Sequence, residues 1–187
     1  MHNRVVTAIA QALCARGVAA LRFNFRGVGL STGDHDNGRG EQADVAGALQ
    51  WLVAQPNVEP ARLYVVGYSF GAWVGLSHAE ADLRVAAVAA VALVPWSYRT
   101  DFYQLRSQAG PRAHPWRFDA AFLETFTRPK LLLTGERDTY STVAQLRELY
   151  DRIPEPKTLG ILSSADHFLH GREQEVGDWI AEFLAAL

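Results

Sequence analysis

Apolar residues recur along the chain with two different periods, which predicts alternating helices and strands. Spacings of three or four residues predict helices around Val5–Leu13, Val45–Val53, Val143–Tyr150 and Val176–Leu187, and a further helix running to about His78. Short apolar runs predict strands at Ala19–Phe23, Arg62–Val66, Val85–Val94 and Lys157–Leu162, with another starting at Lys130. Helices between successive strands indicate an α/β fold, with a mostly parallel sheet covered by helices on both faces. No linker or repeat divides residues 1–187, so we expect a single domain.

One long segment, at about 95–129, does not follow this alternation and is rich in aromatic residues. At about 35 residues it is too short for an independent lid domain. Its rings either line an apolar pocket or pack the segment onto the sheet, and the pattern alone does not separate these two interpretations.

Composition narrows the classes of function. The 187 residues are 49% hydrophobic, so the chain can form a core without a disulfide or a metal ion. Cys14, the single cysteine, stands in the first apolar stripe, which predicts a buried thiol and fits the reducing cytoplasm. A net charge of −2 gives no electrostatic case for nucleic acid or an acidic membrane surface. The longest apolar run, from Val85 to Trp96, is too short to span a bilayer, and the N-terminus has no signal-peptide pattern.

The strongest chemical signal is the sequence Gly67-Tyr68-Ser69-Phe70-Gly71, between the apolar run Leu63–Val66 and a small-residue stretch. This order predicts a strand, a sharp turn and a helix. In a G-x-S-x-G turn of this kind, glycines leave room for the close strand and helix, and the serine hydroxyl is exposed above the sheet. Ser69 is therefore the candidate nucleophile.

A serine nucleophile needs a base, and the base needs an orienting carboxylate. Asp138 follows the strand that starts at Lys130, and His167 follows the strand Lys157–Leu162. Each would lie beyond the carboxyl end of a strand, where open α/β sheets place their chemistry. Asp138 could instead cap the helix starting near Ser141, with Glu136 as the next candidate carboxylate, and His170 competes with His167 as the base.

These features resemble the α/β-hydrolase superfamily, and within it small, lidless serine hydrolases of esterase type. The chain order Ser69, Asp138, His167 is that of the superfamily. The segment Leu21–Ser31 is similar to a strand-to-loop segment that many members place beside the active site, and Gly33–Leu52, with Glu41 and Asp44, is similar to the helix that follows. The resemblance covers nearly the whole chain.

The resemblance implies a fold in which Met1–Val6 already lies in the first helix, so that the strands before it, and a loop giving one backbone N–H to the oxyanion hole, are lacking. The N–H of Phe70 would be the remaining donor. The missing third strand of the family sheet would stand between Ala19–Phe23 and Arg62–Val66.

The function expected from these residues is hydrolysis of carboxylic esters or thioesters of small acyl substrates through an acyl-enzyme. Tyr68, Trp96, Tyr98 and Phe168 are the candidate pocket residues. Neither a metal nor an organic cofactor is needed, the protein is expected in the cytoplasm, and a homo-oligomer is possible. The alternative is a catalytically silent, truncated hydrolase fold that serves as a binding or interaction module.

Overall fold

The computed structural model describes residues 2–94 and 120–187. Its strands are β1 (Leu63–Tyr68), β2 (Val85–Val91), β3 (Lys130–Gly135) and β4 (Lys157–Leu162). Its helices are α1 (Arg4–Ala15), α2 (Arg39–Val53), α3 (Phe70–Ala81), the short 3₁₀ helix η1 (Ala120–Glu124), α5 (Val143–Arg152) and α6 (Glu173–Ala185). The predicted alternation of helices and strands is confirmed for all of these elements except η1, which falls in the segment predicted to be irregular.

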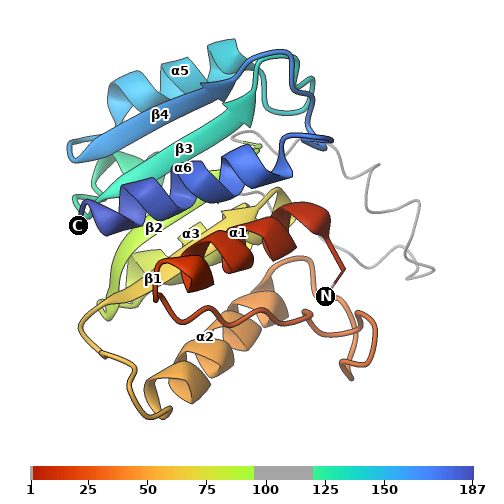
Figure 1. Ribbon diagram of the computed structural model, residues 1–187, viewed down its shortest axis with the longest axis vertical. Helices are drawn as coiled ribbons and strands as arrows, with labels where there is room; N and C mark the ends of the chain where they lie inside the picture. Colours follow the sequence, from red (N-terminus) through yellow and green to blue (C-terminus); the bar gives the residue numbers. More distant parts are fainter. Residues whose placement is uncertain (1, 95–119) are drawn as a thin grey trace.

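The four strands form one parallel sheet in the order β1-β2-β3-β4, so all their carboxyl ends lie at the same edge. Helices α1 and α6 lie side by side on one face (Figure 1), where their apolar stripes and the facing side chains of β2 and β3 form one buried cluster. Helices α2, α3 and α5 contribute to a second buried cluster on the opposite face. The predicted α/β fold with helices on both faces is confirmed.

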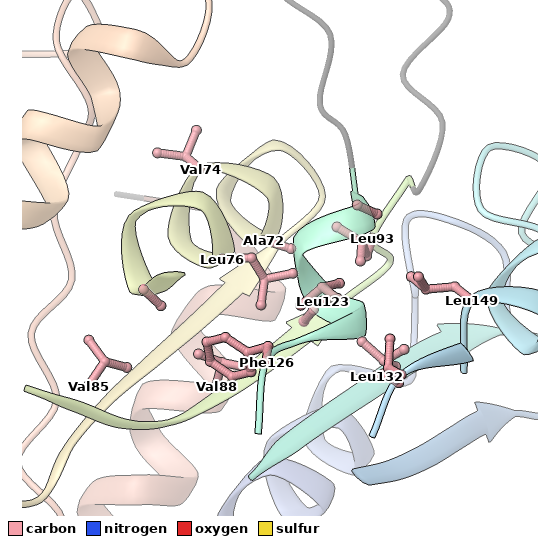
Figure 2. Close-up of a cluster of buried hydrophobic side chains, with 14 of the residues drawn as sticks. Ala72, Val74, Leu76, Val85, Val88, Leu93, Leu123, Phe126, Leu132 and Leu149 are labelled. Carbon is pink, nitrogen blue, oxygen red and sulfur yellow. The ribbon is translucent and has the colours of Figure 1, made fainter. Parts of the chain in front are cut away.

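The second cluster also contains the short helix η1. Figure 2 shows Leu123 and Phe126 beside Val88 and Leu132, so this segment packs onto the sheet with its apolar side chains inward. Lys130, the first residue of β3, is also fully buried, and its ammonium group donates to the carbonyl oxygens of Pro154 and Pro156. At least part of the aromatic segment therefore has a packing role, one of the two interpretations that the sequence left open.

The strand predicted at Ala19–Phe23 does not form, because a strand requires a neighbour with which to exchange backbone hydrogen bonds. In the sheet order β1 is the outermost strand, and Ala19–Phe23 pairs with none of the four. The segment is held by side chains instead: Ala20 packs on the α1–α6 cluster, and Phe25 packs on the opposite one.

Two further predictions are wrong in detail. Cys14 is exposed, because α1 turns Val5, Ile9 and Leu13 toward the sheet and residue 14 lies about 100° further round the helix. Strand β2 ends at Val91 rather than Val94, because Ala92 adopts a φ of 51° that breaks the extended backbone.

Among the described residues, no helix is both long and apolar enough to cross a membrane.

Candidate active site

Ser69 stands between the end of β1 and the start of α3, in a strained backbone conformation with φ 52° and ψ −116°. The turn is possible because Gly67 has no side chain: a Cβ there would lie 2.3 Å from the carbonyl oxygen of Gly71. A Cβ on Gly71, in contrast, would meet no described atom within 4 Å. Of the two glycines expected to make room, only Gly67 is sterically required by the described residues.

The three candidate side chains lie in one line of hydrogen bonds. Ser69 Oγ is 3.0 Å from His167 Nε2, and His167 Nδ1 is 2.8 Å from Asp138 Oδ2. An ionised carboxylate can only accept, so the Nδ1 proton points to Asp138 and Nε2 is left to accept the proton of the serine hydroxyl. A serine, a histidine and a carboxylate in this order have the geometry that activation of a serine by a base requires.

Asp138 uses its two oxygens for different purposes. Oδ1 accepts from the backbone N–H groups of Tyr140 and Ser141, at 2.8 Å each, and thereby fixes the loop after β3. Oδ2 accepts from His167 and, at 3.3 Å, from Thr134 Oγ1, which is fully buried within β3. The N-cap of α5 is Thr142, not Asp138. The carboxylate is therefore a loop anchor and a histidine partner at once.

Neither competing residue joins this line. Glu136 accepts from the backbone N–H of Ser164 at 2.7 Å and from the Ser163 hydroxyl, and these bonds lower the pKa of its carboxyl group. It thus anchors the loop that leads to His167. The ring of His170 stacks on Phe168, with ring centroids 5.7 Å apart.

Aromatic rings surround His167. Tyr68, Tyr140 and Phe168 place their ring centroids 6.0, 4.9 and 5.6 Å from the imidazole. Phe168 is exposed, and the hydroxyl of Tyr68 donates to the carbonyl oxygen of His167. Trp96 and Tyr98, the other two pocket candidates, lie outside the described residues.

The strand–helix turn around Ser69 is also in contact with the loop that precedes α2. Phe70, the first residue of α3, has ring contacts with Phe25 at 5.6 Å and with His35 at 5.3 Å. The loop therefore lies beside Ser69, as the resemblance implied. A helix N-terminus concentrates backbone donors and partial positive charge, which suits the oxyanion role expected of the Phe70 N–H.

Two acidic residues at the start of α2 hold this loop. Glu41 is fully buried and accepts from His35 Nδ1 at 2.7 Å and from the backbone N–H groups of Asp36 and Gly38. Asp44 accepts from both the backbone and the guanidinium of Arg26, and the side-chain bond lowers the pKa of its carboxyl group. The sequence singled out both acidic residues, but no local pattern predicted these hydrogen bonds. The described residues contain no group of three or more His, Cys, Asp or Glu side chains that could hold a metal ion.

A parallel α/β sheet with a serine at a strand–helix turn, and with His and Asp at neighbouring strand ends, is the arrangement of an α/β-type hydrolase. The sequence profile of the alpha/beta hydrolase family matches residues 2–187, and the chain belongs to this family. An uncharacterized protein of Rickettsia prowazekii is 29% identical over 192 residues, which covers 100% of this chain and 73% of that protein.

Two solved structures are similar over nearly the whole chain. An alpha-beta serine hydrolase homologue from Coxiella burnetii is 31% identical, with a TM-score of 0.74 and coverage of 97% of this chain and 76% of that one. A serine hydrolase without a lid from Xanthomonas campestris is 29% identical, with a TM-score of 0.76 and coverage of 100% and 74%. These similarities support hydrolase function.

Proposed function

We propose that this protein is a serine hydrolase that cleaves carboxylic esters or thioesters through an acyl-enzyme formed on Ser69. The observation that supports the proposal best is the continuous line of hydrogen bonds from Ser69 Oγ through the His167 ring to Asp138. Similarity to a lidless serine hydrolase and to a serine hydrolase homologue agrees with it.

In the first half of the reaction, Ser69 Oγ bonds to the carbonyl carbon while His167 Nε2 takes the hydroxyl proton, and the C=O electron pair moves onto oxygen. The N–H of Phe70 donates to that oxyanion. When the C=O bond re-forms, the alcohol or thiol leaves and receives the proton from Nε2. Asp138 stabilises the imidazolium that exists between these two transfers.

In the second half, water replaces the leaving group. His167 takes a proton from the water as its oxygen bonds to the acyl carbon, and returns a proton to Ser69 Oγ as the carboxylic acid departs. The exposed ring of Phe168 beside the imidazole belongs to the proposed acyl pocket. Trp96 and Tyr98 are further candidates for this pocket, whereas the hydroxyl of Tyr68 bonds to the main chain of His167. No step requires a metal or organic cofactor.

The test is covalent labelling with a fluorophosphonate probe at neutral pH, followed by an ester and thioester panel of increasing acyl length. We expect labelling in the wild type and none in Ser69→Ala. Asp138→Asn should lower the labelling rate by about 10⁴-fold, because its amide would favour the wrong imidazole tautomer. A folded wild-type chain that does not label would refute the proposal and favour the silent binding module.

A further inference from the structure

Tyr68 links the strand that carries the nucleophile to the loop that carries the base. It is the last residue of β1 and directly precedes Ser69. Its phenol hydroxyl donates to the backbone carbonyl oxygen of His167 at 2.9 Å, across 99 residues of sequence. The residue beside the nucleophile is therefore bonded to the main chain of the base.

Two hydrogen bonds tie the backbone of the His167 loop to the residues that follow β3. Arg137 N–H donates to Ala165 O at 2.8 Å, and Ser164 N–H donates to Glu136. These bonds fix the loop relative to Asp138. Neither bond reaches β1, which carries Ser69 and lies two strands away from β3 in the sheet.

We propose that Tyr68 is a positioning residue that holds the main chain of His167 at the distance from β1 at which Nε2 meets Ser69 Oγ. This inference rests on the proposed hydrolase function. The imidazole takes and returns protons at a short, fixed distance, so freedom in its backbone would reduce the fraction of molecules with a usable Ser–His hydrogen bond.

The chemical state of the phenol suits this role. Burial raises the pKa of Tyr68 to about 12, and the charges of Asp138 and Asp166 add to the effect. The hydroxyl therefore keeps its proton, and remains a donor, throughout the neutral and mildly alkaline range. Its ring also lies 6.0 Å from the imidazole, at an interplanar angle of 33°, and limits ring movement on that side.

The test variant is Tyr68→Phe, which removes the hydroxyl and keeps the ring. The matched control is Tyr150→Phe, because Tyr150 likewise donates its hydroxyl to a backbone carbonyl, that of Lys157 at 3.3 Å, but does so between α5 and β4. Both variants would be compared with wild type in three measurements: the fluorophosphonate labelling rate, kcat and KM for esters of two acyl lengths, and amide hydrogen exchange of residues 163–170.

Tyr68→Phe is expected to lower the labelling rate and kcat about five- to tenfold, equally for both esters, with KM unchanged and faster exchange at 163–170. Tyr150→Phe should match wild type in all three. Wild-type labelling and kcat in Tyr68→Phe would overturn the inference, as would a rise in KM that depends on acyl length, which identifies a pocket residue. If wild type itself does not label, the proposed function fails first, and the inference fails with it.

Discussion

Replacing Gly135 by alanine tests whether packing against β3 sets the position of His167, the proposed base. Gly135 ends β3, and an added Cβ would lie 2.4 Å from the carbonyl oxygen of Ala165 and 2.6 Å from that of Asp166. Real Cβ atoms essentially never approach closer than 3.0 Å, so the loop must retreat by at least 0.6 Å. Both obstructing atoms are backbone, and no side-chain rotation relieves the contact. The displaced residues immediately precede His167.

A retreat of this size would disturb the 3.0 Å contact between Ser69 Oγ and His167 Nε2. Misplacement of a catalytic group by about 1 Å costs on the order of 10²-fold in rate, so we expect Gly135→Ala to label with fluorophosphonate about 10²-fold more slowly than wild type. The rate would be measured on protein whose folding is verified by circular dichroism and thermal denaturation.

The matched control is Gly47→Ala, in the interior of α2, where an added Cβ meets no described atom within 4 Å. It should label at the wild-type rate and gain about 0.5–1 kcal/mol of stability, because alanine loses less backbone entropy in a helix. Labelling of folded Gly135→Ala at the wild-type rate would refute the argument that this close approach fixes His167.

Three further predictions concern the turn around Ser69, the loop that Glu41 holds, and the buried side chain of Lys130. Gly67→Ala should abolish labelling and lower the melting temperature, because its Cβ would lie 2.3 Å from the carbonyl oxygen of Gly71. Gly71→Ala should retain labelling, because its Cβ would meet no described atom within 4 Å. Equal behaviour of the two variants would contradict this prediction. Glu41→Gln should lower the free energy of unfolding in urea by about 2 kcal/mol. The reason is that a buried carboxylate, which accepts from His35 and two backbone N–H groups, becomes an amide. An unchanged urea midpoint would count against this prediction. Burial lowers the pKa of Lys130 to about 8 from an ordinary 10.5, so the unfolded chain binds more protons between these values. The Lys130 contribution to stability should therefore rise from pH 8 to 10, and the slope of unfolding free energy against pH should be smaller in Lys130→Met.

Much of the fold follows from local patterns in the sequence. The strand predicted at Lys157–Leu162 has those bounds in the structure, and the strand predicted at Arg62–Val66 extends over Leu63–Tyr68. Both are short segments rich in apolar residues and followed by turn-forming residues, a pattern that predicts a strand. The same reasoning placed Ser69, Asp138 and His167 each after the end of a strand. A parallel sheet brings the carboxyl ends of its strands to one edge, so the three residues could be expected on the same side of the sheet.

The errors occur where a neighbouring element decides the outcome. Ala19–Phe23 has the composition of a strand, but backbone pairing depends on a partner that the local pattern does not contain. Cys14 is adjacent to the apolar stripe of α1, and only the docking of the helix shows which side of the stripe is open. Gly71 belongs to the motif, yet its surroundings contain no described atom that a methyl group would meet.

Ser69 and His167, the proposed nucleophile and base, differ in how well the sequence alone locates them, and the reason is physical. The conformation of Ser69 depends on residues within a few positions of it, Gly67 above all, so a five-residue motif identifies it. The position of His167 depends instead on backbone atoms of its own loop, which contact Gly135, Arg137 and Tyr68. Any residue type supplies a carbonyl oxygen, so these contacts leave no mark on the loop sequence. The signal lies in the residues that these backbone atoms contact: Gly135 at the end of β3, where a side chain would clash, and Tyr68 before Ser69, whose hydroxyl reaches across to the loop.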